Sequence, residues 1–411
     1  MRIVYLSGSG QLGGAERCLL DVIQSVRQLE PSWDLALVCS RPGPLVDRAR
    51  ALGVATEVVP MPESVARLGD SAAQDRSGRL LGLGARALGA LRGVVEYRRR
   101  LRDTLKRRAP DIVHTNGFKM HVMGAWSRPS GAALVWHLHD YVSSRPVMGH
   151  AIRHFSRRCD AAIAVSNSVA ADVAPVWRGK SPVRAVLNGV DLEMFAPAGS
   201  KADLDALAGL PPAPEGTVRV GLVATMGRFK GHDVFLRAIA QLPRDLPMRA
   251  YVIGGALYET RGSEFSPEGL RALAAELGVR DIVGFTGFVE EPASAMRALD
   301  VVVHATVVPE PFGLVVAEGM ACGRAVITSA AGGAGEIVHE GEDALVHVPG
   351  SVDGLAAAIH RLVIDRELRI LVGTGGRRSA EQRFDRRRLG AEVTAVYRST
   401  AAAPHPPRSP E

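Results

Sequence analysis

Short runs of apolar residues alternate with amphipathic helical stretches along almost the whole chain. The apolar runs are RIVYL, LALVC, VATEVV, DIVH, ALVWHL and DAAIAVS in the first half, and VRVGLVA, MRAYVIG, IVGFTG, DVVVHA, AVITS and ALVHV in the second. Continuous runs of Val, Ile and Leu that are separated by helices are typical of βαβ units with buried parallel strands. The pattern therefore predicts an α/β fold class.

The apolar runs fall into two groups, and a segment rich in Pro, Gly and Ala separates them. We therefore predict two Rossmann-like, doubly wound domains over residues 1–198 and 217–383, with a linker at 199–216. Ligands of open α/β sheets bind beyond the carboxyl ends of the strands. We accordingly expect the two domains to face a central cleft that holds a pair of substrates.

The C-terminal region carries two further signals. Leu389, Val393 and Tyr397 form an apolar stripe at helical spacing, which predicts a packed terminal helix over 384–400. We expect this helix to pack back toward the first domain. The Pro-rich residues 401–411 are predicted to form a disordered tail.

Composition narrows the class of protein. Of the 411 residues, 46% are hydrophobic and 23% are charged, which is typical of a soluble globular protein. No apolar run approaches the ~20 residues that span a bilayer. The cysteines are far apart without CxxC spacing, which argues against a disulfide scaffold or a zinc ribbon and favours the reducing cytoplasm. They are Cys18, Cys39, Cys159 and Cys322.

Positive charge is concentrated in the first half of the chain. Residues 1–200 carry a net charge of +10, whereas the remainder carries −3. Much of the excess lies in Arg92–Arg108, which is either a solvated helix face or a surface for peripheral contact with an anionic membrane. Nucleic acid is not an expected partner, because aromatic residues make up only 5% of the chain and no nucleic-acid-binding motif is present.

A glycine loop follows the first strand. Residues Gly8 to Gly13 match the GxGxxG pattern of dinucleotide-binding folds, and Gly13 and Gly14 stand where the next helix begins. Unpaired amides and the helix dipole make such a position a site for anions. The second strand ends in Ser40 and Arg41 rather than in the acidic residue that holds a ribose. An NADP-dependent oxidoreductase and a purely structural turn therefore stay open as alternatives.

The strongest chemical signal lies in the second half of the chain. A strand ends, a loop containing Pro and Gly follows, and a helix begins near Gly313, with Glu310 in the loop and Glu318 in the helix. Two carboxylates so placed reach opposite ends of a ligand over the helix N-terminus, where backbone amides suit a phosphate. Because carboxylates accept hydrogen bonds, the pair predicts a hydroxyl-rich ligand such as a sugar or a ribose.

The sequence EPFGLVVAEGMACG, which contains these two glutamates, resembles the signature of the retaining glycosyltransferases of family 4, which have the GT-B fold. Other motifs of that family occur in its order along nearly the whole chain. They are GGAE at 13–16, HD at 139–140, AVSNSV at 164–169, NGVD at 188–191, GRFKGHD at 227–233, GFV at 287–289 and GGAGEIV at 332–338. The resemblance implies that the second domain binds a nucleotide-diphosphate sugar, with UDP favoured over GDP, and that the first domain binds a hydroxyl acceptor.

The resemblance also implies roles for single residues at the donor sugar nucleotide. Glu318 matches the residue that holds the ribose hydroxyls, and Glu310 matches the residue that contacts the donor sugar. The base is expected to be recognised by backbone near residues 287–289. The residues expected at the donor through their backbone are Gly13, Gly14, Gly287, Phe288, Val289, Phe312, Gly313 and Leu314.

Arg228 and Lys230 match the pair of cations that neutralises the diphosphate in the family. A leaving diphosphate gains negative charge as the glycosidic bond breaks, and cations placed on it stabilise that change in the transition state. The family commonly separates the pair by a short loop, whereas only one residue lies between them here. On a turn between a strand and a helix, the two side chains need not point the same way.

Histidines end a strand of the first domain. By resemblance, His139 lies near the donor sugar and the reacting centre. His137, two residues earlier, is expected to be a deeper core histidine bonded to backbone. The candidate residues for binding the acceptor are His114, Asn116, Lys119, His121 and Asp140.

No nucleophile is evident in the sequence. The resemblance implies front-face transfer in which the leaving diphosphate deprotonates the acceptor hydroxyl, with no cofactor and no metal, so that the protein supplies positioning and electrostatics. The DxD sequence at 203–205 is interpreted as a solvated helix face rather than a metal site. The acceptor stays open between a lipid-linked or cell-envelope glycan and a small-molecule natural product.

Overall fold

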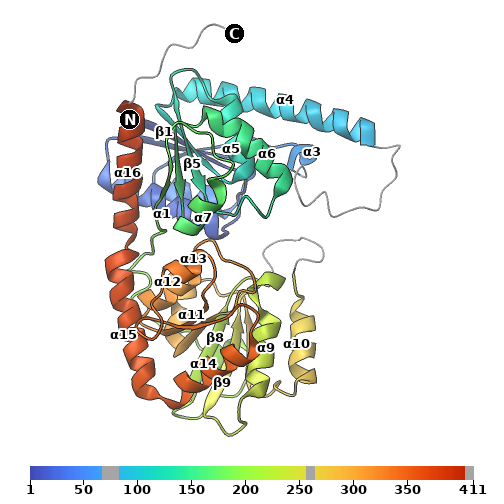
Figure 1. Ribbon diagram of the computed structural model, residues 1–411, viewed down its shortest axis with the longest axis vertical. Helices are drawn as coiled ribbons and strands as arrows, with labels where there is room; N and C mark the ends of the chain where they lie inside the picture. Colours follow the sequence, from blue (N-terminus) through green and yellow to red (C-terminus); the bar gives the residue numbers. More distant parts are fainter. Residues whose placement is uncertain (67–82, 256–263, 403–411) are drawn as a thin grey trace. The chain divides into compact units, whose positions relative to one another are not determined.

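The computed structural model describes residues 1–66, 83–255 and 264–402 (Figure 1). The chain divides into two compact units, which we call unit 1 (Met1–Gly189 with Arg386–Glu411) and unit 2 (Val190–Asp385). Each unit contains one parallel sheet with its helices, so the predicted α/β class with two Rossmann-like domains is confirmed. The chain leaves unit 1 after Gly189 and returns to it at Arg386.

Unit 1 contains a seven-stranded parallel sheet in the order β3-β2-β1-β4-β5-β6-β7. Its strands are β1 (Arg2–Ser7), β2 (Asp34–Cys39), β3 (Ala55–Val58), β4 (Ile112–Asn116), β5 (Ala133–Leu138), β6 (Ala161–Ala164) and β7 (Val183–Ala185). Its helices are α1 (Gly14–Leu29), α2 (Pro44–Ala51), α3 (Glu63–Ala66), α4 (Leu83–Arg108), α5 (Phe118–Ser127), α6 (Pro146–Phe155), α7 (Asn167–Val173) and α16 (Arg386–Ala402). The strand order reverses between β1 and β4, which makes their carboxyl ends a topological switch point.

The terminal helix α16 belongs to unit 1 and packs against α1, as the sequence predicted. Leu389, Val393 and Tyr397 are fully buried in the core of this unit. The two helices approach so closely that a Cβ atom on Gly390 would lie 2.4 Å from the Cβ atom of Ser25. Glycine at this position is therefore what allows α16 to rest on α1.

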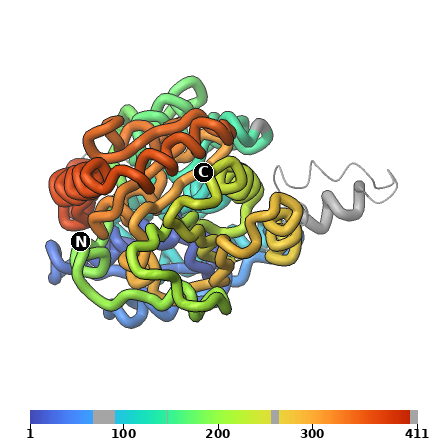
Figure 2. Tube along the Cα trace, turned by 90° about the horizontal axis from the view of Figure 1, so that it is seen from below, coloured from blue at the N-terminus to red at the C-terminus, as the bar shows by residue number. Residues whose placement is uncertain are grey.

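Unit 2 contains a six-stranded parallel sheet in the order β10-β9-β8-β11-β12-β13, and Figure 2 traces this unit from green at Val190 to red-orange at Asp385. Its strands are β8 (Val218–Val223), β9 (Met248–Ile253), β10 (Val283–Gly287), β11 (Val301–His304), β12 (Ala325–Ser329) and β13 (Leu345–His347). Its helices are α8 (Leu204–Leu207), α9 (His232–Gln241), α10 (Pro267–Glu276), α11 (Pro292–Ala298), α12 (Leu314–Ala321), α13 (Gly333–Glu336), α14 (Val352–Ile364) and α15 (Arg366–Arg383). Its switch point lies between β8 and β11.

Residues 199–216 lie within unit 2 instead of forming a linker between the domains. The first unit ends at Gly189, earlier than the boundary at residue 198 that the composition suggested. Within the segment, Asp203 caps the short helix α8, because its Oδ1 atom accepts a hydrogen bond from the Ala206 amide at 3.0 Å. The high proportion of Pro, Gly and Ala therefore indicates an irregular segment here, but it does not indicate a domain boundary.

The interpretation of the DxD sequence as a solvated helix face is wrong for Asp205, which is buried. Its carboxylate accepts hydrogen bonds from the Tyr251 hydroxyl at 2.6 Å, the Arg249 guanidinium at 2.5 Å, the Arg219 guanidinium at 3.2 Å and the Ala213 amide at 3.0 Å. Burial opposes ionisation, but these hydrogen bonds, that of Tyr251 first, hold the pKa of the Asp205 carboxyl well below its ordinary value. Asp205 thus fastens the segment before β8 to β8 and β9.

The basic segment Arg92–Arg108 lies in α4, which has a buried face and a solvent face. Tyr97, Leu101 and Leu105 are fully buried, while Arg107 and Arg108 pair with Glu57 at 2.8 and 3.2 Å. Part of the positive charge is therefore used within the fold. None of the helices in the described part of the chain combines the length and the apolar character needed to cross a bilayer.

We expect Asp205→Ala to lower the free energy of unfolding of unit 2 by about 3 kcal/mol, because two partly buried guanidiniums lose their shared partner. The matched control Asp203→Ala removes only a helix cap and should cost about 1 kcal/mol. The contribution of Asp205 should be present at neutral pH and be lost as the pH falls below about 3.9, since its native pKa is depressed.

Hydrogen exchange of peptides from unit 2, measured against denaturant, reports this loss. Tryptophan fluorescence does not, because all four tryptophans lie in unit 1. Equal losses in the two variants would contradict the role given to Asp205.

Candidate functional site

The candidate donor site lies at the switch point of unit 2, where the chain leaves the neighbouring strands β8 and β11. After β8 the chain makes a 3₁₀ turn at Arg228–Lys230 and enters α9. After β11 it passes through the loop that carries Glu310 and enters α12. Because parallel strands end at the same edge, the topology brings these two distant segments together.

Lys230 and Glu310 form an ion pair at this edge. The Lys230 ammonium lies 2.9 and 2.8 Å from the two carboxylate oxygens of Glu310. The side chains are only 19% and 17% exposed, so solvent screens the pair weakly. The structure thus brings together two residues that the sequence analysis placed separately at the diphosphate and the donor sugar.

A chain of hydrogen bonds holds the Glu310 carboxylate in place. The Thr306 hydroxyl donates to it at 3.2 Å and lies 2.7 Å from Nε2 of His304, whose Nδ1 lies 2.9 Å from the Thr328 hydroxyl. Burial opposes ionisation of Glu310, but Lys230 and then His304 hold the pKa of its carboxyl well below the ordinary value. Glu310 is therefore an ionised acceptor of hydrogen bonds at neutral pH.

The backbone on both sides of this pair is fixed by glycine. Gly231, at a φ of 74°, separates the Lys230 turn from α9, and a Cβ atom there would lie 2.0 Å from the Ala305 carbonyl oxygen. Gly313 precedes α12 with a φ of 90°, which side chains rarely adopt. Gly231 thus allows a close approach of two backbones, whereas Gly313 supplies a backbone conformation that other residues rarely adopt.

Glu318 lies in α12, as the sequence predicted from the helix beginning near Gly313, and the structure shows that it is half-buried. Phe312 is buried against Phe384, with ring centroids 6.0 Å apart. Phe312 therefore fixes the segment that precedes α12 against Phe384, which follows α15, and Leu314 is the first residue of α12. The roles of these residues at a donor stay predictions.

The side chains of Arg228 and Lys230 point in different directions. Its guanidinium is exposed and lies over the Phe265 ring, 4.6 Å from the centroid. The single residue between them, Phe229, is also exposed. The short spacing thus sends the two cations to different partners, and Lys230 alone of the two meets Glu310.

The segment expected at the nucleotide base follows β10. Gly287 has a φ of 71°, and its carbonyl oxygen accepts a hydrogen bond from the Gly254 amide at 2.9 Å, beside the end of β9. Phe288 is 66% exposed and Val289 is half-buried. An exposed aromatic ring on a fixed turn can stack on a planar base, so the geometry is compatible with the prediction.

In unit 1, the predicted glycine loop begins α1, with Gly13 as the residue before the helix and Gly14 as its first residue. Gly10 packs tightly in this loop, because a Cβ atom there would lie 2.3 Å from the Pro42 carbonyl oxygen. Gly10 therefore has a structural reason to be glycine. The contribution of Gly13 and Gly14 to a donor site stays a prediction.

One face of the sheet in unit 1 gathers several candidate residues. His114 is buried, and its Nδ1 lies 2.8 Å from the Tyr397 hydroxyl. Asn116 pairs in register with His137, whose ring lies 4.2 Å from that of His139. His137 is fully buried as predicted, but the expected backbone bond is absent, because neither of its ring nitrogens has a partner among the described residues.

The other acceptor candidates lie elsewhere in unit 1. His121 stacks on Trp136 at 5.0 Å, and Trp136 alternates with His137, so it points to the opposite face of the sheet. The Lys119 ammonium donates to the Ala66 carbonyl oxygen. Asp140 is exposed and lies 3.6 Å from Arg145. The structure therefore does not bring these five candidates into one group.

Burial keeps the histidines of this region neutral. It lowers the pKa of His121 and of His137 to about 3, and it lowers those of His114 and His139 well below the ordinary value. These four histidines are thus polar but uncharged at neutral pH. The sequence identified these four histidines from their positions near strand ends. Except for His137, it did not predict how deeply they are buried.

Comparison with known families covers both units. Residues 12–194 match the family model described as Glycosyltransferase Family 4, and residues 211–378 match the model described as Glycosyl transferases group 1. The first match lies mostly in unit 1 and the second lies entirely in unit 2.

Several curated relatives carry the name D-inositol 3-phosphate glycosyltransferase, and two of them illustrate the likeness. The one from Nocardiopsis dassonvillei is 37% identical over 184 residues, which is 43% of this chain and 41% of the relative. The one from Streptomyces bingchenggensis is 34% identical over 220 residues, which is 52% of this chain and 47% of the relative. The matched part thus spans about half the length of these relatives or less.

Solved structures share the fold over nearly the whole chain. The Anabaena protein HepE, crystallised with UDP, aligns with a TM-score of 0.77 at 24% identity and covers 97% of this chain and 100% of its own. Sucrose-phosphate synthase from Thermosynechococcus elongatus aligns with a TM-score of 0.76 at 21% identity, covering 98% and 100%. These likenesses establish the GT-B fold.

We expect unit 1 to lose stability when the pH falls from 7.5 to 5, because its native histidines resist protonation. For His121 the native pKa of about 3 lies below the unfolded value of about 6.5, so its stabilising contribution is present above pH 6.5 and shrinks below it. At pH 5 the loss is about 2 kcal/mol for this one residue.

Tryptophan fluorescence during urea unfolding at the two pH values measures the effect, because all four tryptophans lie in unit 1. His121→Gln should remove about 2 kcal/mol of the pH dependence, whereas the matched control His360→Gln, on a helix of unit 2, should leave it unchanged. A pH dependence that is the same in all three proteins would refute the assignment.

Proposed function

Since the chain belongs to the family 4 glycosyltransferases, we propose that it transfers a hexosyl sugar from UDP to a hydroxyl group of an acceptor with retention of configuration. The observation that carries the proposal is the Lys230–Glu310 ion pair beside the start of α12. The family membership replaces the NADP-dependent oxidoreductase that the glycine loop had left open.

The donor is proposed to bind unit 2. Lys230 supplies a cation for the diphosphate, the free amides at the start of α12 supply hydrogen-bond donors, and Glu318 supplies an acceptor for the ribose hydroxyls. HepE has been crystallised with UDP-glucose, which supports UDP as the nucleotide. Phe288 at the end of β10 is the proposed neighbour of the base.

Glu310 is proposed to accept hydrogen bonds from hydroxyls of the donor sugar. A diphosphate beside Lys230 would share the ammonium with Glu310, which leaves carboxylate lone pairs for the sugar. Because Thr306 and His304 fix the carboxylate, the sugar would be oriented without a large loss of side-chain entropy. Positioning of this kind is the main contribution that the protein makes.

Transfer is proposed to occur on one face of the sugar. The bond between the anomeric carbon and the diphosphate oxygen breaks, the acceptor oxygen forms its bond on the same face, and the acceptor proton passes to the leaving diphosphate. Lys230 stabilises the charge that grows on this leaving group. His139 of unit 1 is proposed to contact the donor sugar, and neither a cofactor nor a metal is required for the step.

The acceptor is proposed to bind unit 1, and of the two classes left open we favour a small polyol. The relatives in Nocardiopsis and Streptomyces are named for D-inositol 3-phosphate, which is a small cyclic polyol that carries a phosphate group. Contact of Arg92–Arg108 with an anionic membrane, at its cytoplasmic face, stays the alternative for a lipid-linked acceptor. The pairing of Arg107 and Arg108 with Glu57 leaves less charge for that contact.

Lys230→Ala should weaken UDP binding and lower kcat about 10²–10³-fold, because the leaving diphosphate loses its cation. Calorimetry with UDP and mass spectrometry of the product from UDP-glucose measure the two effects. The matched control Lys201→Ala removes an exposed lysine of unit 2 and should change neither. Equal behaviour of the two variants would remove the support for the proposed site.

Glu310→Gln should bind UDP at least as tightly as the unaltered protein, because Lys230 loses its internal counter-charge. The same variant should lower kcat for transfer from UDP-glucose about 10²–10³-fold, since the sugar loses a charged hydrogen-bond acceptor. Calorimetry and product analysis again separate the effects. Unchanged turnover would show that Glu310 does not act on the donor sugar.

A further inference from the structure

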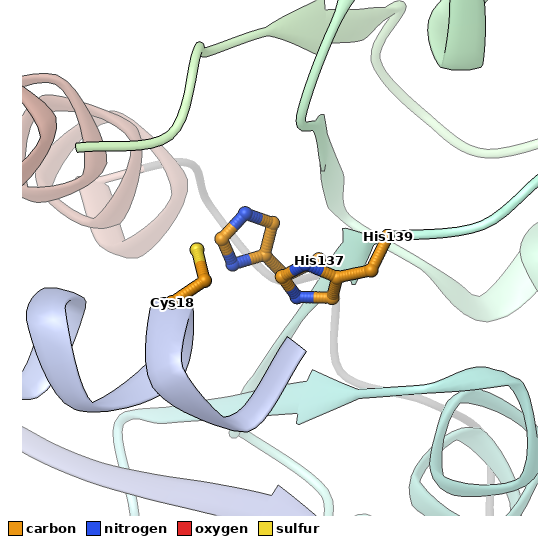
Figure 3. A group of neighbouring side chains, drawn as sticks. All are labelled: Cys18, His137 and His139. Carbon is orange, nitrogen blue, oxygen red and sulfur yellow. The ribbon is translucent and has the colours of Figure 1, made fainter. Parts of the chain in front are cut away.

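Three side chains that can ligate a metal meet in unit 1, on the sheet face covered by α1 and α16. Cys18 lies in the second turn of α1, and His137 and His139 follow one another on the same face at the end of β5 (Figure 3). Their candidate ligand atoms all lie within 4.8 Å of one another. Cys18 is distant in the sequence from His137 and His139. No sequence motif predicted that these three side chains meet.

The histidines of this cluster have unmet hydrogen-bonding capacity. Both ring nitrogens of His137, which is fully buried, and Nε2 of His139 have no partner among the described residues. Buried polar atoms without partners are costly and rare in native proteins. The neighbouring His114 has a partner for Nδ1 in Tyr397 and none for Nε2 among the described residues, whereas His137 lacks a partner at both ring nitrogens.

Cys18 is the one cysteine of the described chain that a metal-ligand cluster includes. Its thiol is buried and donates to the Asn188 side-chain oxygen at 2.8 Å. By contrast, Cys39 and Cys159 donate to backbone carbonyl oxygens at 3.1 and 3.0 Å. Cys322 is buried in unit 2, and within the described ranges it belongs to no group of three or more metal-ligating side chains.

We propose that Cys18, His137 and His139 form a binding site for a zinc ion within unit 1, with one sulfur and two nitrogen ligands. Thiolate and imidazole are ligands that zinc prefers, and sites with three protein ligands keep a fourth position for water. Zinc bonds of about 2.3 Å to sulfur and about 2.0–2.1 Å to nitrogen require the ligand atoms to draw closer by about 1 Å. Rotation of the side chains supplies such a movement.

Binding replaces the S–H bond of Cys18 by an S–Zn bond, and the proton leaves to solvent without any change of oxidation state. The neutral imidazoles contribute lone pairs. Asn188, which accepts from the thiol, can turn its amide so that it donates to the thiolate. Such a bond from a neighbouring group stabilises a metal-bound ligand.

The site has a consequence for catalysis that rests on the proposed function. His139 is the residue of unit 1 proposed to contact the donor sugar, and a zinc ion would occupy its Nε2 atom. Zinc should therefore inhibit transfer, although the step itself needs no metal. The donor site in unit 2 contains none of the three ligands, so UDP binding should not change.

Cobalt(II) titration of the full-length, chelator-treated protein tests the site directly. We expect one equivalent to give a thiolate-to-cobalt charge-transfer band and the visible bands of tetrahedral cobalt. Cys18→Ser should abolish the charge-transfer band, and Cys322→Ser, the matched control, should keep it. Absence of the band in the unaltered protein, or its persistence in Cys18→Ser, would overturn the proposal. If the cluster holds only buried water, or binds no metal, the unaltered protein would show no charge-transfer band.

Zinc affinity gives a second readout, measured by competition with a chromogenic chelator. Cys18→Ser and His137→Gln should each bind at least about 100-fold more weakly than Cys322→Ser. Urea unfolding in chelator, followed by tryptophan fluorescence, identifies a variant that fails to fold. If one of these two variants fails to fold, the other decides the outcome. Unchanged zinc affinity in a variant that folds would overturn the proposed zinc site.

Inhibition of transfer completes the test. For each protein, the measured quantity is the ratio of the transfer rate with zinc to the rate without metal. This ratio should be low for the unaltered protein and close to one for Cys18→Ser. Equal inhibition in both would overturn the regulatory role. Since the cobalt spectrum requires no turnover, a failure of the proposed function is distinguishable from a failure of the metal site.

Discussion

The close approach of Gly231 to the Ala305 carbonyl oxygen is the constraint on which the site in unit 2 depends. It joins the segment after β8 to the end of β11, and it lets Lys230 reach across to Glu310. A side chain at position 231 would force the two backbones apart. The electrostatics of the pair is therefore a consequence of backbone geometry. The hydrogen bond from Thr306, whose hydroxyl is itself bonded to His304, refines a position that the turn has already set.

Much of this arrangement could be predicted from the sequence, because it follows from local patterns. Continuous apolar runs predicted the parallel strands, the stripe at Leu389, Val393 and Tyr397 predicted a packed α16, and Gly313 marked the start of α12. The topology of an α/β sheet then places the ends of neighbouring strands side by side. The edge that carries Lys230 and Glu310 could thus be located, whereas their direct pairing depends on side-chain orientation, which periodicity does not report.

The errors share one cause, which is that burial through distant contacts leaves no local mark. The Pro- and Gly-rich surroundings of Asp205 predict a solvated acid. Its carboxylate nevertheless binds Arg219 of the following strand, and Arg249 and Tyr251 of a strand more than 40 residues away. His137 follows the ordinary pattern of a strand, and that pattern does not show that its buried ring nitrogens have no partner among the described residues. The division after Gly189 is a separate matter, because a change in composition need not coincide with a division between compact units.

The return of α16 to unit 1 makes that unit discontinuous in the sequence, with unit 2 inserted between its parts. During synthesis on a ribosome, the inserted unit is therefore complete before the last helix of its host emerges. Until then, the apolar surface of α1 and the sheet face that carries Tyr5 and His114 are uncovered. In the folded protein, Leu389, Val393 and Tyr397 of α16 cover them. The nascent first unit should accordingly depend on chaperone shielding for longer than the second, since exposed apolar surface in incomplete domains promotes aggregation.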